Sequence, residues 1–343
     1  MRTLSIRRPD DWHLHLRDGV ALAAVAPATA AVFGRALVMP NLKPPVRTLD
    51  DALAYRQRIL EVAPGLRPLM TLYLTDGTTP DDVRAAAAHP DVVAAKLYPA
   101  GATTNSDSGV TDIGAMDPVF AAMAESGLVL CVHGEVTHRD VDVFDREARF
   151  LEEILVPLRA RHPALRIVLE HITTADGIAF VQAHEDGVGG TITPQHMLLN
   201  RNALFEGGLR PHHYCLPVLK RETHRRAIVE AVTTGDRRFF LGTDSAPHAK
   251  GAKESDCGCA GVYSAPHALP LYAEAFDAAG ALEHLEAFAS LNGPAFYGLA
   301  PNDDTITLEA VETPVADELP FGDTTIVPFR AGASVAWRVR TDG

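Results

Sequence analysis

The sequence is poor in cysteine, in aromatic residues and in long apolar runs. Of its 343 residues, 6% are aromatic and only four are cysteines: Cys131, Cys215, Cys257 and Cys259. Four irregularly spaced cysteines are too few for a disulfide framework in a chain of this size. The most apolar run, Val20 to Phe33, contains a proline and is too short to span a bilayer. These shortages exclude a disulfide scaffold and argue against a membrane-spanning protein.

An excess of basic residues is also lacking. Lys and Arg number 31 against 44 Asp and Glu, which gives a formal net charge of -13. This balance disfavours nucleic acid and anionic membranes as partners, and an anionic substrate would need positive charge concentrated at its site. Because the first residues lack the apolar core of a signal peptide, we expect a cytoplasmic protein. The Cys257-Gly258-Cys259 stretch lacks the usual Cys-x-x-Cys spacing, so we interpret it as a loop without redox chemistry.

Short apolar runs alternate with alanine-rich helical stretches along most of the chain. This pattern is typical of βα units that close a parallel sheet. We predict eight strands: Asp11 to Leu16, Ala36 to Met39, Leu69 to Leu74, Val92 to Leu97, Leu128 to Val132, Ile167 to Glu170, Gly190 to Thr193 and Phe239 to Thr243. Helices fit between them, for example Asp51 to Val62, Asp145 to Ala160, and one that Thr79 caps ahead of Pro80.

Eight such units with no flexible linker, low-complexity tract or internal repeat predict one α/β domain, a (β/α)8 barrel that takes up residues 1–343. The composition changes after Pro301. Residues 305–309 and 333–339 resemble exposed strands, so we expect a small β-rich C-terminal extension, about 301–343, packed on the barrel.

The first predicted strand carries the stretch Asp11-Trp12-His13-Leu14-His15-Leu16-Arg17-Asp18-Gly19. Period-two alternation places His13 and His15 on one face and Trp12, Leu14 and Leu16 on the other. Two imidazoles that converge on one point favour a metal ion, although a pair of core histidines would show the same spacing.

Other predicted strands end in residues of the same chemical kind. In a (β/α)8 barrel the reactive groups lie where strands end and loops begin, on the carboxyl-terminal face. Collecting the polar residues at the predicted strand ends gives six that should meet at one mouth: His13, His15, Lys96, His133, His171 and Asp244.

Four imidazoles and a carboxylate exceed the three ligands that one catalytic zinc usually takes, so the set predicts two metal ions. Two neighbouring cations repel each other, and neutral histidines add no charge to offset this. Asp244 alone can bind only one side of the metal pair well, and a protonated Lys96 has no lone pair with which to bind a metal. Lys96 therefore either lies elsewhere and binds a substrate anion or has been converted into an anion.

Six motifs along the chain together resemble those of the dihydroorotases, in their short, single-barrel bacterial type within the amidohydrolase superfamily. They are the stretch from Asp11 to Gly19, Met39-Pro40-Asn41-Leu42, Ala95-Lys96-Leu97-Tyr98-Pro99, Val132-His133-Gly134-Glu135, Glu170-His171-Ile172-Thr173 and Gly242-Thr243-Asp244-Ser245-Ala246-Pro247-His248. The resemblance runs in order through almost the whole chain and is weakest in the last forty or so residues.

The resemblance implies two Zn²⁺ ions per subunit. His13, His15 and Asp244 would hold one and His133 and His171 the other, bridged by a carboxylated Lys96, whose carbamate supplies the missing anion. The implied reaction is the reversible cyclisation of N-carbamoyl-L-aspartate to L-dihydroorotate in pyrimidine biosynthesis. In hydrolysis a metal-bridging hydroxide would attack the ring amide, while Asp244 acts as general base and then as general acid.

The implied substrate is an anion, and the resemblance assigns residues to it. Arg17, Asn41 and His248 would bind its carboxylate, Arg17 as a bidentate fork. Backbone groups of Leu216 and Ala260 would contact the amide edge of the ring.

A small, polar loop, Gly101 to Gly109, follows Lys96. We expect it to act as a lid in which Thr103 and Thr104 reach the substrate and water is excluded on closure. A plain surface loop would have the same composition.

Three alternatives remain open at this point. Arg17 would be a surface residue if it only pairs with Asp18 or Asp11. A hydantoinase or allantoinase would share the metal ligands but not the carboxylate site. A non-catalytic pathway scaffold should have lost metal ligands, whereas all six positions are present. The resemblance further implies a homodimer.

Overall fold

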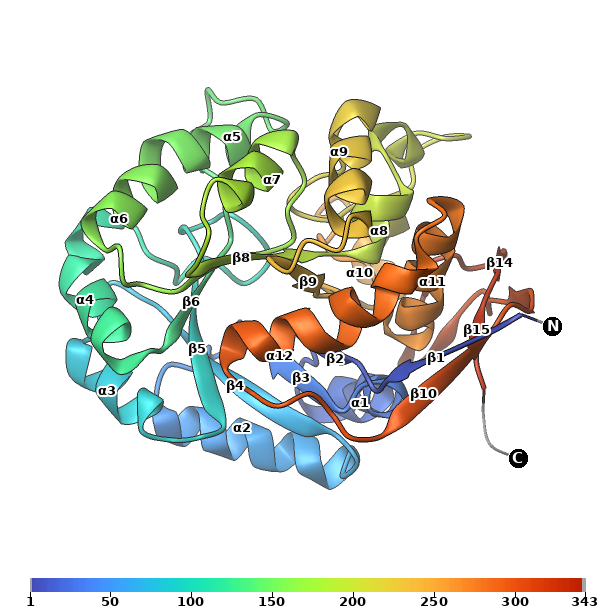
Figure 1. Ribbon diagram of the computed structural model, residues 1–343, viewed down its shortest axis with the longest axis horizontal. Coiled ribbons are helices and arrows are strands. Elements are labelled where there is room, and N and C mark those ends of the chain that lie inside the picture. Colours follow the sequence, from blue (N-terminus) through green and yellow to red (C-terminus); the bar gives the residue numbers. More distant parts are fainter. Residues whose placement is uncertain (1, 341–343) are drawn as a thin grey trace.

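The computed structural model describes residues 2–340, and a sheet of eight parallel strands forms its centre (Figure 1). The strands neighbour one another in chain order: β2 (Asp10–Leu14), β3 (Arg35–Val38), β4 (Arg67–Tyr73), β5 (Val92–Leu97), β6 (Val129–Val132), β7 (Ile167–Leu169), β8 (Val188–Ile192) and β9 (Phe239–Leu241). All eight predicted strands are confirmed, and no predicted end differs from the observed one by more than two residues.

The sheet closes between its first strand and the segment that follows its last one. The backbone N–H of Asp244 donates to the carbonyl of His13 at 2.8 Å, and the N–H of His15 donates to the carbonyl of Ser245 at 3.0 Å. These bonds complete the predicted (β/α)8 barrel. They also bring two predicted metal-binding motifs, more than 200 residues apart in sequence, into direct contact.

Helices surround the barrel (Figure 1). They are α1 (Gly19–Val32), α2 (Leu49–Val62), α3 (Pro80–Ala87), α4 (Asp117–Ser126), α5 (Arg146–Phe150), α6 (Val156–Arg161), α7 (Ala175–Gln182), α8 (Pro194–Leu198), α9 (Glu222–Thr233), α10 (Lys250–Lys253), α11 (Ala268–Ala278) and α12 (Asn292–Tyr297). Shorter turns are η1 (Gly114–Met116), η2 (Leu151–Leu155), η3 (Arg201–Leu204), η4 (Pro211–His213), η5 (Ala265–His267), η6 (Leu282–His284) and η7 (Ala287–Leu291).

The predicted N-terminal cap of α3 is present. The Thr79 hydroxyl accepts from the N–H of Asp82 at 3.2 Å, and the Asp82 carboxylate accepts from the N–H of Thr79 at 2.8 Å. This reciprocal pair satisfies backbone donors that the first turn of α3 leaves free. The helix predicted over Asp145 to Ala160 is present, but its middle turn, η2, is wider than an α-helical turn.

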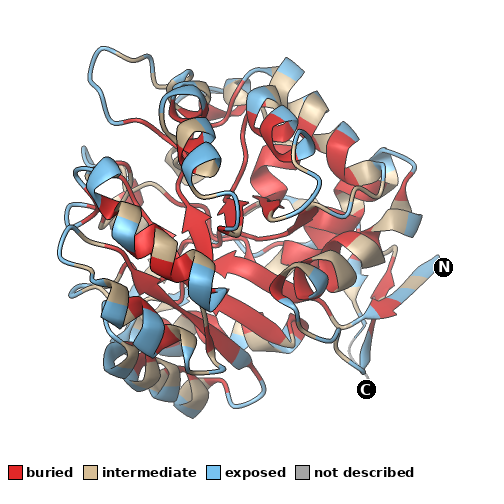
Figure 2. Ribbon diagram, turned by 60° about the vertical axis from the view of Figure 1, so that its left-hand side comes forward, coloured by how far each residue is buried: buried red, intermediate tan, exposed pale blue. Residues whose placement is uncertain are grey.

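The core has an inner layer inside the barrel, an outer layer between the barrel and its helices, and a smaller third cluster that joins residues 203–219 to the C-terminal extension. Figure 2 shows that the strands of the barrel are buried. Leu14 and Leu16 lie in the outer layer as predicted. The expectation for Trp12 was wrong: its indole packs in the inner layer and stacks on Tyr297 with ring centroids 4.4 Å apart. The cause is an irregular register between β2 and β3 from Asp11 to Leu14, which interrupts the strict alternation.

The C-terminal extension consists of short antiparallel strands: β10 (Thr305–Glu309), β11 (Thr313–Pro314), β12 (Leu319–Phe321), β13 (Thr324–Ile326), β14 (Ser334–Val335) and β15 (Arg338–Val339). Its main sheet includes an N-terminal strand that the sequence did not predict, β1 (Thr3–Arg7), which pairs with β10 along its whole length. The extension is less exposed than expected, because Val335 and Trp337 are buried. The ends of the predicted single domain, Met1 and residues 341–343, lie outside the described residues.

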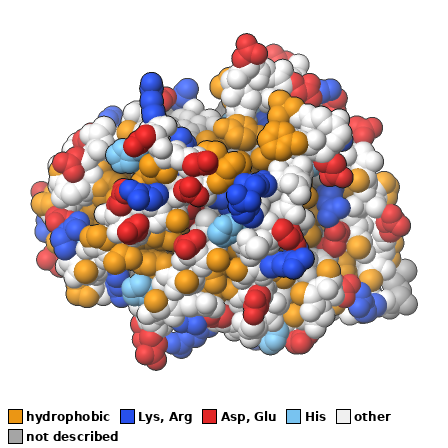
Figure 3. Space-filling view, turned by 90° about the horizontal axis from the view of Figure 1, so that it is seen from above, with side chains coloured by type: hydrophobic (Ala, Val, Ile, Leu, Met, Phe, Trp, Pro, Cys, Tyr) orange, Lys and Arg blue, Asp and Glu red, His pale blue; other side chains and the backbone are white. Residues whose placement is uncertain are grey.

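The outer surface mixes charges of both signs. Figure 3 shows acidic and basic side chains interspersed over one face of the molecule, without a continuous basic field. Within residues 2–340, no helix combines the length and the apolarity that crossing a bilayer requires.

Candidate metal centre and substrate pocket

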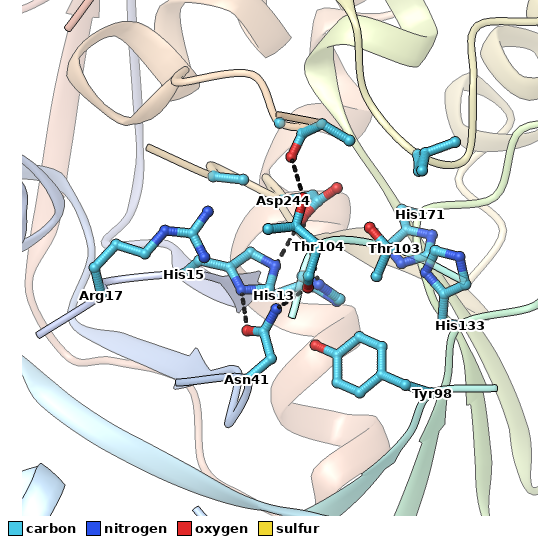
Figure 4. A pocket seen from close by; sticks show the side chains of 14 residues that line it. His13, His15, Arg17, Asn41, Tyr98, Thr103, Thr104, His133, His171 and Asp244 are labelled. Atoms are coloured by element: carbon cyan, nitrogen blue, oxygen red, sulfur yellow. Dashed lines mark hydrogen bonds and ion pairs between the residues drawn. The ribbon is translucent and has the colours of Figure 1, made fainter. Parts of the chain in front are cut away.

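A small cavity opens at the carboxyl-terminal ends of the barrel strands (Figure 4). Its walls come from the end of β2 and from the segments that follow β2, β3, β5, β6, β7, β8 and β9, the last of which continues beyond α10. The lining residues are His13, His15, Arg17, Asn41, Tyr98, Thr103, Thr104, His133, His171, Leu216, Asp244, Ala246, Ala260 and Gly261. Of the predicted site residues, only Lys96 and His248 are outside this lining, and both lie directly behind it.

Four imidazoles form a continuous row along the cavity floor. Ring centroids are 5.5 Å apart between His15 and His13, 5.0 Å between His13 and His171, and 4.9 Å between His171 and His133. Figure 4 shows His133 and His171 together on one side of the cavity and His13, His15 and Asp244 toward its middle. The structure therefore brings together the side chains that the strand-end argument predicted to meet.

At one end of the row, His13, His15 and Asp244 form a group that could hold a metal ion, with ligand atoms within 4.8 Å of one another. Asp244 Oδ1 lies 3.1 Å from Nε2 of His15 and 3.5 Å from Nε2 of His13. Burial raises the pKa of Asp244, but the contact with His15 and the neighbouring positive groups outweigh burial and lower this pKa to about 2. The carboxylate is therefore ionised at neutral pH.

Polar partners on the far side of three imidazoles determine which ring nitrogen faces the cavity. His13 Nδ1 donates to Glu170 Oε2 at 2.7 Å, and His15 Nδ1 donates to Asn41 Oδ1 at 2.7 Å. Burial lowers the pKa of His15 to about 4, so its ring is neutral and carries one proton. With that proton on Nδ1, the lone pair of His15 Nε2 points toward the Asp244 carboxylate, an arrangement that suits a cation between them.

The same arrangement recurs at the other end of the row with the nitrogens exchanged. His133 Nε2 donates to Glu135 Oε2 at 2.9 Å, which leaves Nδ1 as the lone-pair nitrogen. Burial lowers the pKa of His171 well below its usual value, so this ring is neutral too. Its Nδ1 is buried and finds no hydrogen-bond partner among residues 2–340. These nitrogens suit metal coordination better than hydrogen bonding.

Lys96, the last polar residue of β5, is fully buried behind the cavity floor. Its Nζ has no hydrogen-bond partner in the described part of the chain and lies 5.2 Å from the centroid of the Tyr98 ring. Burial lowers the pKa of Lys96, although the charge of Glu170 acts in the opposite direction. An unpartnered ammonium at such a position is costly, and this cost needs an explanation.

Three site residues have left-handed backbone conformations that are rare outside glycine. The φ angles are 59° at Arg17, 41° at His171 and 45° at Asp244. Such conformations cost about 1–3 kcal/mol each and persist where the surrounding structure enforces them. They turn the chain directly after a barrel strand, so that the side chain points into the mouth.

Arg17 lies at the end of the cavity farthest from His133 in Figure 4, and His248 lies behind it. Arg17 Nε donates to the carbonyl of Pro247 at 2.9 Å, and its Nη2 lies 2.9 Å from His248 Nε2. The surface pairing with Asp18 or Asp11 is wrong, because Asp18 binds Arg58 on the outside of the barrel. The site thus combines a row of imidazoles with the half-buried guanidinium of Arg17.

The loop from Gly101 to Gly109 lies over this end of the cavity. Thr104 Oγ1 donates to the carbonyl of Ala260 at 3.3 Å, and Asn41 Nδ2 donates to the carbonyl of Thr104 at 3.1 Å. Thr103 and Thr104 both line the cavity. A plain surface loop would not make these contacts, and the lid role stays a prediction.

Some residues of the site were not predicted from the sequence. Tyr98 lines the cavity, and its buried hydroxyl lacks a hydrogen-bond partner within residues 2–340. It lies two residues after Lys96, so strand alternation could have indicated it. Glu135 has a similar signal two residues after His133. Glu170 precedes His171 but binds His13, a pairing that no local pattern predicts.

The chain belongs to the amidohydrolase family, whose pattern matches residues 10–307. More specifically, it is a member of the dihydroorotases. A protein of Aromatoleum aromaticum with that name is 64% identical over 344 residues, 99% of this chain and 100% of the relative. The crystal structure of dihydroorotase from Saccharomyces cerevisiae in complex with 5-fluoroorotic acid superposes with a TM-score of 0.92 at 34% identity, and 99% of each chain is covered.

A hydantoinase from Arthrobacter aurescens shares the fold alone. Its TM-score is 0.77 at 18% identity, with 99% of this chain and 85% of the hydantoinase covered. The full-length identity to dihydroorotases therefore separates the chain from the hydantoinase alternative, which the fold by itself could not exclude.

Proposed function

We propose that the chain catalyses the reversible cyclisation of N-carbamoyl-L-aspartate to L-dihydroorotate with loss of water, at a centre of two Zn²⁺ ions. The observation that carries this proposal is the row of four imidazoles with an ionised Asp244 beside His13 and His15, and with Arg17 at the end of the same small cavity that lies away from His133. The imidazoles and Asp244 suit cations, and Arg17 suits a substrate carboxylate.

The donor set fits two ions. His13, His15 and Asp244 would hold one, and His133 with His171 the other. The close approach of lone pairs on His15 and Asp244 supports a cation between them. When bound, such ions polarise a carbonyl oxygen and acidify a water molecule.

A carbamate on Lys96 would bridge the two ions. The neutral amine adds to carbon dioxide and releases one proton, which replaces a buried cation by an anion. Two observations support this step: Lys96 Nζ is fully buried, and it has no hydrogen-bond partner among the described residues. The cost of burying the charge of an ordinary ammonium would not be compensated here, whereas the negative charge of a carbamate would be balanced by the two cations.

Asp244 is the proton carrier in this mechanism. In the hydrolytic direction water adds to the ring carbonyl carbon, and the ionised Asp244 accepts its proton. The carbon–nitrogen bond then breaks, and Asp244 gives the proton to the departing nitrogen. Cyclisation follows the same path in reverse, with Asp244 taking the proton from the ureido nitrogen. Its low pKa keeps it ionised at neutral pH, the form that a proton acceptor must have.

The substrate carboxylate would bind between Arg17, Asn41 and His248. The guanidinium of Arg17 is half-buried and is not paired with a carboxylate in the described chain, so its remaining N–H donors are free to bind an anion. The backbone of Leu216 and Ala260 forms the opposite wall and would contact the amide edge of the ring. A hydantoinase substrate lacks this carboxylate, and Arg17 therefore favours dihydroorotate.

The test is a dihydroorotate hydrolysis assay on protein with counted metal, repeated for Asp244→Ala and Lys96→Ala. We expect activity to be almost abolished in both variants, with metal content reduced most clearly in the lysine variant. Dihydroorotate that is not hydrolysed by metal-loaded wild-type protein would contradict the reaction. Full activity in either variant would contradict the role of that residue. Protein that binds no metal would restore the scaffold alternative.

The active form is proposed to be a homodimer, as the sequence resemblance implies, with each subunit acting as a single catalytic domain. Light scattering on the purified protein measures its mass directly, and a value near 36.8 kDa would contradict a dimer.

A further inference from the structure

A buried lysine next to the substrate pocket has no role in the mechanism described so far. Lys253 is the last residue of the short helix α10, and 4% of its surface is exposed. None of the ion pairs between residues 2 and 340 includes it. The adjacent Glu254 is bound by His212 at 2.9 Å instead. A buried ammonium without a carboxylate partner is costly and calls for a functional explanation.

Three backbone carbonyls take up the donors of this ammonium group. Lys253 Nζ donates to the carbonyl oxygens of Tyr214 at 2.8 Å, Cys259 at 2.8 Å and Gly261 at 2.6 Å. These carbonyls belong to two separate chain segments, 214–216 and 259–261. A direct bond from the N–H of Gly261 to the carbonyl of Tyr214, at 3.0 Å, joins the same segments. Lys253 therefore connects two loops that would otherwise share one backbone bond.

Both connected segments form the wall of the substrate pocket. Leu216 and Ala260 each follow a carbonyl that Lys253 holds, and both line the cavity. The carbonyl of Ala260 contacts Thr104 Oγ1 at 3.3 Å and His248 Nε2 at 3.0 Å. A shift of these segments would displace the backbone groups that the proposed function assigns to the ring.

The charge of Lys253 also reaches the carboxylate end of the pocket. Burial lowers the pKa of His248 to about 2, and the charges of Arg17 and Lys253 contribute to this effect. The titratable groups that face Lys253 are the thiols of Cys215 and Cys259 and the phenol of Tyr214. Burial raises the pKa of all three groups, so none carries a negative charge at neutral pH. The positive potential of Lys253 is therefore not cancelled locally.

We infer that Lys253 is a positioning residue for substrate binding, which aligns the two backbone segments along the ring and adds a second positive charge behind the site of the substrate carboxylate. This inference rests on the proposed function, because it takes the substrate to be a carboxylated ring. It explains how a chain with a net charge of -13 retains an anionic substrate with a single arginine in the cavity wall.

The test compares Lys253→Met with Lys253→Arg and with a matched control, Lys250→Met. Lys250 lies in the same helix, is exposed and pairs with Glu318 at the surface. We expect Lys253→Met to raise KM for dihydroorotate by about tenfold or more, with kcat within about threefold and unchanged metal content. Lys253→Arg keeps the charge and should recover most of the loss. Lys250→Met should match the wild type.

The pH profile adds a readout that a purely structural lysine would not affect. Burial lowers the pKa of Lys253 to about 8. Because the charged form favours an anion, KM of the wild type should rise above pH 8, and this rise should be absent in Lys253→Met.

A folded Lys253→Met protein with wild-type KM would overturn the inference, as would equal losses of kcat and metal. If that variant does not fold, a wild-type KM that stays constant from pH 7 to 9.5 overturns it. Wild-type turnover of dihydroorotate tests the proposed function separately, since it involves no Lys253 variant.

Discussion

Replacing Arg17 by methionine tests the carboxylate site most directly. The Nε of this guanidinium is already bound to the carbonyl of Pro247, and Nη2 contacts His248. Of the five N–H donors of an arginine, at least two remain for a ligand on the cavity side. Each hydrogen bond to a charged group contributes about 1.5–3 kcal/mol, so losing such a pair costs about 3 kcal/mol or more.

A loss of about 3 kcal/mol corresponds to a fall in kcat/KM on the order of 100-fold, since about 1.4 kcal/mol is a factor of ten. We expect the loss mainly in KM, because the carboxylate is bound in the ground state and in the transition state alike. The assay is steady-state hydrolysis of dihydroorotate at equal metal content. Dihydrouracil, the same ring without a carboxylate, should show no comparable difference between the two proteins.

The matched control for this experiment is Arg58→Met. Arg58 is an exposed arginine that binds Asp18 on the outside of the barrel, and its removal should leave kcat/KM within about twofold. If Arg17→Met retains kcat/KM within threefold of the wild type, the carboxylate does not bind where we place it. An equal loss for dihydrouracil would also refute the reasoning, because Arg17 would then act on the ring or on the fold.

Three further predictions concern the lid, the response to pH and the barrel core. Replacing Thr103 and Thr104 together by alanine should lower turnover while metal content is unchanged, because the lid would no longer close over the substrate. Burial and the charge of Lys220 lower the pKa of His196 to about 4, so this residue by itself should lower the free energy of unfolding by up to about 3 kcal/mol between pH 6.5 and 4, in addition to the decrease caused by other buried histidines such as His15. Gly293→Ala should destabilise the protein by at least about 1–3 kcal/mol in denaturant unfolding, since the new Cβ would lie 2.0 Å from the indole nitrogen of Trp12.

Each of these predictions has its own control. Wild-type turnover in the variant that lacks both threonines would contradict the lid role of this loop. For His196, the sign follows because the unfolded state binds the proton first as the pH falls, and His196→Gln should show a smaller decrease over this range. If the free energy of unfolding of His196→Gln decreased as much as that of the wild type over this pH range, the role of His196 would be contradicted. Gly65→Ala places its Cβ in open space and should leave stability within about 0.5 kcal/mol, so equal effects of the two glycine variants would contradict the packing argument.

The barrel and the location of its site could be predicted from the sequence because parallel strands in chain order carry their carboxyl ends to one rim. His133, His171 and Asp244 each follow an apolar run, and His13 lies within the first strand, so their positions on the predicted strands indicate that they meet. The metal-binding role of these residues and the carboxylation of Lys96 stay predictions.

The packing around the site could not be predicted in the same way. Strict alternation placed Trp12 on the wrong layer, because the register of β2 against β3 is irregular there. The strand β1 was missed because its partner, β10, lies far along the chain: the paired residues are between 298 and 306 positions apart. Pairings of this kind depend on contacts that a local pattern does not contain.

The sequence by itself determined the order of the βα units and the chemical type of the residue at each strand end, since both depend on short stretches with a regular period. Only the tertiary structure decided which carboxylate binds which imidazole, as with Glu170 and His13, and which carbonyls surround the ammonium of Lys253. The physical reason is that hydrogen bonds are short and directional, so their partners are chosen by the register of the closed sheet and by the paths of its loops.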